Sequence, residues 1–162
     1  MSAGRQPLTR TFASAEELHA AVGSTLGTSD WLEIDQHRID LFAEATSDHQ
    51  WVHVDPERAK EGPYGTTIAH GFLTLSLVVP LTSGLLQLDT AKMKLNYGLD
   101  RVRFLTPVTA GSRVRATAKL LAVDDTKTGL RTRMEITIEL EGSHRPACVA
   151  ETLVLIVPDT AR

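Results

Sequence analysis

Residues 70–81 have the sequence HGFLTLSLVVPL, and this stretch decides the fold. Leucine and valine lie on every side of the helix that it predicts, so we expect this helix to lie inside the core. Pro80 has no backbone N–H to donate to the Ser76 carbonyl, which predicts a kink or an end of the first helical segment there. The apolar stretch over residues 72–88 is interrupted by serine, threonine, proline and glutamine. We therefore expect a core helix and not a membrane span.

The chain after this helix is predicted to form antiparallel strands. Residues 93–105, 112–124, 130–141 and 146–157 are rich in valine, isoleucine, leucine and threonine, and apolar side chains alternate clearly in the two middle segments. Turn-forming residues at 124–129 and 141–143 predict hairpins. These patterns indicate an α+β fold, a curved antiparallel sheet wrapped around a long apolar central helix, which is called a hotdog. One such sheet covers its helix on one side only, so we expect a homodimer.

Length and composition limit the class of protein. The chain has 162 residues, enough for one domain (1–162) with an N-terminal extension over residues 1–25. Its net charge is −3, and its lysines and arginines are scattered, which disfavours nucleic acid and anionic membrane as partners. Cys148 is the only cysteine, so an intrachain disulfide is impossible. With a polar stretch over residues 1–11, this predicts a cytoplasmic protein.

The first half of the chain is predicted to be mainly helical. Ser14 and Glu17 form a capping box for a short helix over residues 15–22, and residues 31–34 favour a strand. Asp35 is a suitable N-cap for a helix over residues 36–46. Residues 47–54 have no helical period and are expected to be a loop, as are residues 62–65 with two glycines and a proline. Between these loops, Asp55 and Pro56 predict a helix start.

The loop SDHQWVHVD at residues 47–55 is the first candidate site. Asp48 follows the C-terminus of a predicted helix, where the helix dipole disfavours a carboxylate, and this cost suggests a function. Asp48 and His53 can share one water, with one group taking its proton while the other orients it. The alternative is a solvated polar turn. His49 and His53 also have the spacing of a helical metal pair, but helical geometry is not expected here, so no metal is predicted. Asp55 is assigned to capping.

The segment IAHGF at residues 68–72 is the second candidate site. Gly71 begins the central helix, where backbone N–H groups lack intrahelical partners. Without a side chain, Gly71 would let a ligand carbonyl approach its N–H, which predicts an oxyanion site. The alternative is a glycine that allows close packing. His70 is interpreted as a buried or capping histidine outside the mechanism. Residues 72–88 contain no Asp or Glu, so acid–base groups must come from the earlier loop.

Three motifs together resemble a known family. FAEATSDHQWVHVD at residues 42–55, GTTIAHGF at residues 65–72 and NYGL at residues 96–99 look like the MaoC-like hydratases, which are hotdog (R)-specific enoyl-CoA hydratases. The usual family core is Gly-Asp-x-Asn-Pro-x-His. Here Asp48 and His53 match, whereas Ser47, Gln50 and Trp51 replace the Gly, Asn and Pro. The chain is more similar to the branch of (3R)-hydroxyacyl-thioester dehydratases and nodulation-protein-N-like proteins, over residues 31–157.

The resemblance implies reversible hydration of a trans-2-enoyl thioester, of coenzyme A or acyl carrier protein, to the (3R)-hydroxyacyl thioester. It implies that Asp48 and His53 activate the water and that the Gly71 N–H polarises the thioester carbonyl. No cofactor is expected. Asn96 and Tyr97 are candidates to line the acyl pocket. The altered loop must hold its shape in another way, and burial of Trp51 is one possibility.

Two other functions are open at this point. Hotdog folds also host thioesterases, but these commonly place a carboxylate on the central helix, where this chain has none. The second alternative is a non-catalytic protein that binds acyl thioesters.

Overall fold

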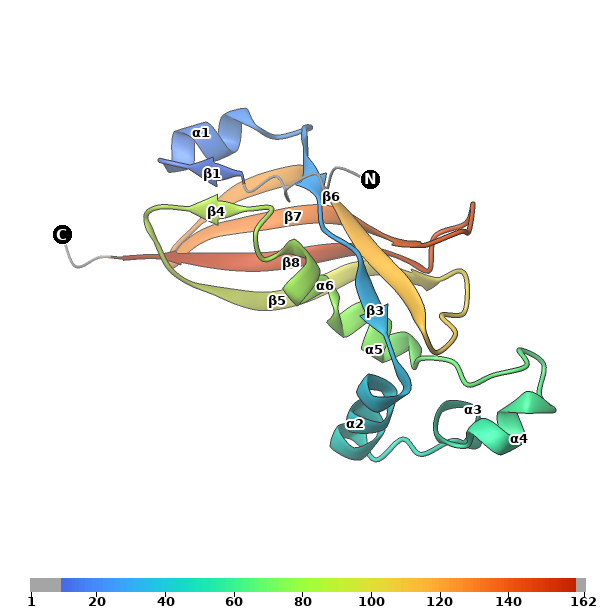
Figure 1. Cartoon of the computed structure of the whole chain (residues 1–162). Coiled ribbons are helices and arrows are strands. Elements are labelled where there is room, and N and C mark those ends of the chain that lie inside the picture. Colours follow the sequence, from blue (N-terminus) through green and yellow to red (C-terminus); the bar gives the residue numbers. More distant parts are fainter. Residues whose placement is uncertain (1–9, 160–162) are drawn as a thin grey trace.

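The computed structural model describes residues 10–159 and shows a curved antiparallel sheet packed against a short helical layer (Figure 1). Its main sheet has the strand order β2-β6-β7-β8-β5, and β3 also pairs with β6. The strands of this sheet are β2 (Thr25–Thr28), β3 (Leu32–Ile34), β5 (Ala91–Phe104), β6 (Ser112–Thr126), β7 (Gly129–Leu140) and β8 (Cys148–Pro158). The fold is therefore a single α+β hotdog, as the sequence predicts.

The remaining elements lie at two ends of the molecule. A small parallel pair, β1 (Thr11–Phe12) and β4 (Gln87–Leu88), lies beside α1 (Ala15–Ala20) at one end. The helices α2 (Gln36–Thr46), α3 (Trp51–Val54) and α4 (Pro56–Lys60) gather at the opposite end (Figure 1). The segment that follows α4 returns to the sheet and leads into α5 (Gly71–Ser76) and α6 (Val78–Thr82).

The predicted alternation correctly identifies the inner face of the sheet. On β6, the side chains of Val114, Ala116, Ala118 and Leu120 are fully buried. Their cross-strand partners on β7 include Ile136 and Ile138, which are also fully buried. Because side chains alternate between faces along a strand, this single register places every second residue in the core.

For the central helix, one expectation is confirmed and one is wrong. It is divided into α5 and α6 at Leu77, three residues before Pro80. This division is expected, because proline has no N–H to donate to the Ser76 carbonyl. Its apolar surface is covered on one face only: Leu73 and Leu81 are buried, whereas Phe72 is 69% and Val79 53% exposed. The expectation of a helix inside the core is therefore wrong for the isolated chain.

Two more expectations about the first half are tested by the structure. The N-caps are confirmed, because Asp35 accepts a hydrogen bond from Arg38 N–H and Asp55 accepts one from Arg58 N–H. The expected loop over residues 47–54 is partly wrong, because its last four residues form α3. Four residues are too few to show a helical period, and this turn is held by local bonds such as His53 N–H to the Gln50 carbonyl.

No helix in the described part of the chain, residues 10–159, is long and apolar enough to cross a membrane.

Candidate active site

Asp48 lies in the turn that leaves the C-terminus of α2. Ser47, the residue that ends this helix, has the left-handed conformation with φ 60° and ψ 24°. This conformation costs a residue with a Cβ about 1–2 kcal/mol, and it turns the chain sharply away from the helix axis. The Asp48 carboxylate that follows is exposed and accepts a long hydrogen bond, 3.4 Å, from Gln50 N–H. The turn thus presents a carboxylate that has free acceptor positions.

His53 is brought to the same place by α3 and is 8% exposed. Its Nδ1 lies 2.7 Å from the Ile68 carbonyl oxygen. A carbonyl can only accept, so Nδ1 carries the proton of the neutral ring and Nε2 presents a lone pair. The position of α3 is fixed from the other side by Gln36, whose side chain donates to the His53 carbonyl at 2.8 Å. This arrangement makes His53 Nε2 available as a base.

The structure adds His70 to the predicted pair. Asp48, His53 and His70 each offer one oxygen or nitrogen atom, and these atoms lie within 4.8 Å of one another. His70 is 2% exposed, and its ring stacks on that of His53 with centroids 3.8 Å apart and an interplanar angle of 23°. The sequence interpretation that left His70 out as a buried histidine was right about its burial. It missed the contact with His53, because residues 48, 53 and 70 come together only in the fold.

The donor set of this cluster resembles a zinc site, but its geometry suits a water better. One carboxylate and two imidazoles are ligands that zinc accepts. However, nitrogen lone pairs lie in the ring planes, and two stacked rings direct them side by side and not toward one point. The Asp48 and His53 atoms of the cluster lie within 4.8 Å of each other, which is close enough for one water to bond to both. The other metal candidate, His49, is exposed and pairs with Glu44 at 2.7 Å.

Trp51 does help to shape this loop, although it is only partly buried. The Arg58 guanidinium lies 4.5 Å from its ring centroid, a cation–π contact. On another side, a Cβ at Gly62 would come within 3.1 Å of the Trp51 ring, so the backbone packs closely against it. These contacts connect α3 to α4 and to the turn after it.

Gly71 begins α5 directly after His70, so its N–H has no intrahelical acceptor. The close-packing alternative is also supported, because an added Cβ would lie 3.0 Å from the Phe104 ring on β5. Phe104 is 47% exposed and meets Phe72 edge to face, with centroids 6.1 Å apart. The absence of a side chain at Gly71 therefore has at least one packing reason, whatever the role of its N–H.

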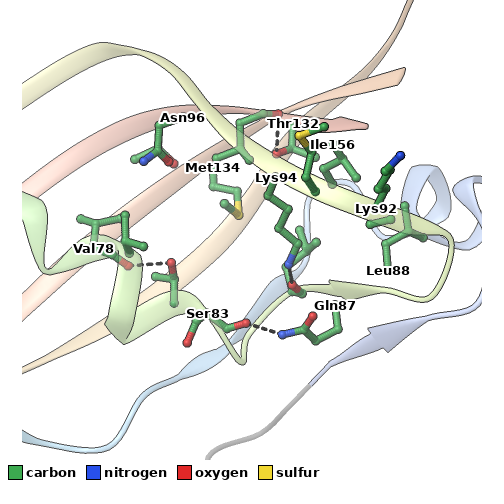
Figure 2. A pocket seen from close by; sticks show the side chains of 17 residues that line it. Val78, Ser83, Gln87, Leu88, Lys92, Lys94, Asn96, Thr132, Met134 and Ile156 are labelled. Carbon is green, nitrogen blue, oxygen red and sulfur yellow. Dashed lines mark hydrogen bonds between the residues drawn. The ribbon is translucent and has the colours of Figure 1, made fainter. Parts of the chain in front are cut away.

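A cavity of about 480 Å³ lies farther along the central helix, between α6 and the sheet (Figure 2). Val78 and Ser83 line it from the helical side, and Met134 and Ile156 from the sheet. The Lys94 side chain extends from β5 toward residues 83–88 and donates to the Leu86 carbonyl, and burial lowers its pKa from the ordinary value. Asp48, His53 and Gly71 are not among the residues that line this cavity, so it is a separate space in the single chain.

The two residues that the sequence predicts to line the acyl pocket, Asn96 and Tyr97, both line cavities beside the central helix. Asn96 lines the 480 Å³ cavity and also a second one of about 260 Å³, which extends to Leu75 and Ser76 on α5. Tyr97 lines the second cavity and is 61% exposed. Both residues lie at a β-bulge, where the pairing of β5 with β8 shifts between Asn96 and Gly98. The cavities thus follow the helix from one turn beyond Gly71.

Comparison with known proteins gives consistent relatives. The family model described as "MaoC like domain" matches residues 17–141. The chain is 52% identical to "3-hydroxyacyl-thioester dehydratase Z" of Mycobacterium tuberculosis, over 91% of this chain and 99% of that protein. It is 48% identical to "Nodulation protein N" of Rhizobium leguminosarum bv. viciae, over 88% of this chain and 91% of that protein.

Solved structures show the same fold at low sequence identity. The unliganded R-hydratase PhaJ1 from Pseudomonas aeruginosa has a TM-score of 0.69 and 21% identity, over 85% of this chain and 83% of that chain. The monoamine oxidase regulatory protein from Archaeoglobus has a TM-score of 0.75 and 23% identity, over 93% and 98% of the two chains. At this identity the likeness concerns the fold, and function must be argued from the site.

Proposed function

Because this chain belongs to the MaoC-like domain family, we propose that it interconverts trans-2-enoyl thioesters and (3R)-hydroxyacyl thioesters by adding or removing water. The curated relative that it matches at 52% identity carries the name 3-hydroxyacyl-thioester dehydratase. The single observation that carries the proposal is the Asp48–His53 pair. An exposed carboxylate and a histidine with its lone pair on Nε2 lie close enough to hold one water between them.

The proposed hydration begins with that water. The Asp48 carboxylate accepts one of its protons in a hydrogen bond, which orients the oxygen, and His53 Nε2 removes the other proton. The water oxygen then bonds to C3 of the enoyl group, and the electrons of the C2=C3 double bond move toward the thioester carbonyl oxygen. His53 returns its proton to C2, so one water has been added and the histidine is again neutral. General acid–base catalysis of this kind contributes about 10²–10⁴-fold.

The Gly71 N–H is proposed as the donor that stabilises the developing charge on the thioester oxygen. One well-placed donor of this type contributes about 3–4 kcal/mol to the transition state. With the carbonyl at Gly71, the acyl chain would extend along α5 and α6 toward the cavities that Asn96 and Tyr97 line. These positions support, for Asn96 and Tyr97, the proposed role of contacting the acyl group.

The test is incubation of the protein with crotonyl-CoA. Loss of the enone absorbance indicates hydration, release of a free thiol indicates a thioesterase, and neither indicates a binding protein. Coupled dehydrogenases specific for each 3-hydroxyacyl enantiomer identify the product. Because both transferred parts of the water come from one side of the enoyl group, we expect syn addition. The resemblance to the (R)-specific hydratases implies that this side is the one that gives only the (3R) product.

Variants of the pair test its role in the same assay. Asp48→Asn and His53→Ala should each lower kcat/KM by about 10²-fold or more, and the double variant should be little worse, because the two groups act as a unit. A solvated loop without function predicts near-normal kinetics for both variants. Formation of the (3S) product, or full activity of Asp48→Asn, would contradict the mechanism.

The thioesterase and the acyl-thioester binding protein remain the alternatives, and one structural feature bears on the first. The described central helix, α5 and α6, carries no carboxylate, whereas the hydrolytic mechanism considered for hotdog proteins needs one there. Among the described residues, the carboxylate grouped with the two histidines is that of Asp48, in the turn after α2. This favours the hydratase.

A homodimer is proposed from the surface of the single chain. β5 is the end strand of the main sheet, is 14 residues long and exposes nearly all of its side chains. A long unprotected edge strand favours pairing with another chain. Its exposed apolar residues lie beside the uncovered side of the central helix: Val79 lines one cavity with Met93 and another with Leu99. Phe72 contacts Phe104 at the end of the same strand. A second copy that pairs through β5 would cover both surfaces, and sedimentation at micromolar concentration should give twice the monomer mass.

For location, we propose the cytoplasm, because the buried thiol of Cys148 suits a reducing compartment. We also propose that the chain acts as one domain, since α1 of the N-terminal extension contacts β6 of the main sheet, and β2, which follows it, pairs with the same strand.

A further inference from the structure

His70 is a buried polar residue to which the proposed mechanism assigns no role. Its Nε2 lies 2.9 Å from the backbone carbonyl oxygen of Asp48. The carbonyl can only accept, so the proton of the neutral ring is on Nε2. Nδ1 therefore carries the lone pair, and it is buried without a hydrogen-bond partner among the residues that the structure describes. A buried polar atom without a partner destabilises the fold, so its presence needs an explanation.

The same side chain contacts both members of the proposed catalytic pair. Its N–H holds the backbone of Asp48, and its ring face stacks on His53 at 3.8 Å between centroids. The Phe42 ring of α2 also contacts the His70 ring, with centroids 5.0 Å apart. His70 thus joins three segments, namely the end of α2, α3 and the start of α5, at the point where the water would be held.

Counting hydrogen bonds excludes His70 as a ligand of that water. A water molecule has two protons to donate, and in the proposed mechanism these go to the Asp48 carboxylate and to His53 Nε2. A third partner would have to donate to the water oxygen. The only N–H of neutral His70 is already given to the Asp48 carbonyl, and its Nδ1 can only accept. His70 can therefore act on the water only through its two neighbours.

We propose that His70 is a positioning residue, which sets the separation between the Asp48 carboxylate and His53 Nε2 by bonding the backbone of the first and stacking on the ring of the second. The inference rests on the proposed hydratase function. This chain has a particular need for such a contact, because its loop lacks the Asn and Pro of the usual family core. The Asp48 carboxylate is exposed, and its hydrogen bond to Gln50 is long. A 1 Å displacement of a catalytic group can lower a rate by about 10²-fold.

Two substitutions separate the hydrogen bond from the ring. His70→Phe keeps an aromatic ring that can stack on His53 but deletes the donor to the Asp48 carbonyl. His70→Gln loses the ring but keeps an amide N–H that can reach the carbonyl. We expect His70→Phe to lower kcat about 10- to 100-fold and to change KM by less than about threefold. KM should change little because other residues are proposed to bind the thioester. His70→Gln should retain more of the wild-type kcat than His70→Phe, because the donor is kept, but less than the wild type, because the stacked ring is lost.

The pH profile of kcat distinguishes positioning from proton transfer. If His70 positions its neighbours, the profile of His70→Phe keeps the wild-type shape at lower amplitude. Loss of one limb of the profile would mean that His70 itself transfers a proton, and would overturn the proposal. The matched control is His49→Gln in the same loop, because His49 is exposed and contacts Glu44. It should retain kcat within twofold.

A readout without catalysis separates this inference from the proposed function. Nitrogen-15 NMR of the wild-type protein should show His70 protonated on Nε2 and His53 on Nδ1. In His70→Phe, the amide signals of Asp48 and its neighbours should shift or broaden, while the His53 tautomer is retained. If the wild-type protein does not hydrate crotonyl-CoA but these signals behave as expected, the proposed function fails and the positioning contact stands. Unchanged loop signals, or wild-type kcat in His70→Phe, would overturn the inference.

Discussion

The substitution Gly71→Val tests the assignment of the Gly71 N–H most directly. The added Cβ would lie 3.0–3.2 Å from three atoms of the Phe104 ring, closer than carbon atoms normally approach. Phe104 is about half exposed, so its ring can move by the few tenths of an ångström that are needed. Overpacking of this kind costs about 1–3 kcal/mol, and the helix start loses no hydrogen bond. The protein should stay folded, with a melting temperature lower by about 2–12 °C.

The effect on activity should be much larger. The methyl groups of valine would hold a thioester carbonyl away from the N–H, and loss of one such donor lowers turnover by about 10²–10³-fold. We therefore expect kcat/KM on the best enoyl-CoA substrate to fall by at least about 10²-fold in an assay that follows the enone absorbance. Circular dichroism and the melting curve of the same preparation show that the fold is retained.

A second variant separates the two reasons for a glycine at this position. In a Phe104→Leu background, the ring that the valine would strike is absent. If Gly71→Val acts through crowding of Phe104, this background should restore activity. If it acts by displacing the thioester carbonyl, the double variant should be as inactive as Gly71→Val alone. Wild-type kcat/KM in Gly71→Val, or recovery in the double variant, would refute the oxyanion assignment.

Three further predictions concern the scaffold. Ser47→Gly should raise the free energy of unfolding by about 0.5–1 kcal/mol in denaturant titration, because glycine relieves the left-handed strain at φ 60° but loses more entropy on folding; an unchanged or lower value would contradict this. Gly129→Ala should lower the free energy of unfolding by at least about 3 kcal/mol, because the added Cβ would lie 2.1 Å from the Ile156 carbonyl oxygen. Gly142→Ala, at φ 77° with open space around it, should lower it by only about 1 kcal/mol. Burial raises the pKa of the Cys148 thiol to about 11, so at pH 8 the native protein should react with iodoacetamide about 100-fold more slowly than the urea-unfolded chain; equal rates would show that the thiol is accessible and ionised.

The elements with strong local signals were predictable from the sequence. Alternation over residues 114–120 places four side chains in the core, and the caps Asp35 and Asp55 begin helices in the structure. The division of the central helix follows from the missing N–H of Pro80. Each of these signals depends on the geometry of a few consecutive residues, so the sequence contains all the information that they need.

Elements that depend on distant partners were not predictable in the same way. β1 and β4 are two residues each and exist because Thr11 and Phe12 pair with Gln87 and Leu88, far along the chain. Exposure of the central helix likewise depends on how far the sheet curves around it, and no local sequence pattern predicts that curvature. At the candidate site, Asp48 and His53 were identified from spacing and resemblance, and their roles remain predictions. His70 was missed because its two contacts join residues that are 17 and 22 positions away.

Residues 67–69, just before the central helix, connect the candidate site to the sheet. Its middle residue, Ile68, donates its N–H to the Val52 carbonyl at 3.0 Å and accepts the His53 Nδ1–H through its own carbonyl. The same segment is attached to the sheet side, because Ala69 N–H bonds the Val108 carbonyl and Ala110 N–H bonds the Thr67 carbonyl. His70 then follows at once and reaches Asp48. The His53 tautomer is therefore set by the Ile68 carbonyl, whose position depends on the register of residues 67–69 against residues 108–110. The His70 tautomer is set by the Asp48 carbonyl. A change that shifts this register should move the His53 and His70 rings together. The backbone of this segment thus holds the exposed Asp48 carboxylate opposite the His53 lone pair, although the two side chains share no direct bond.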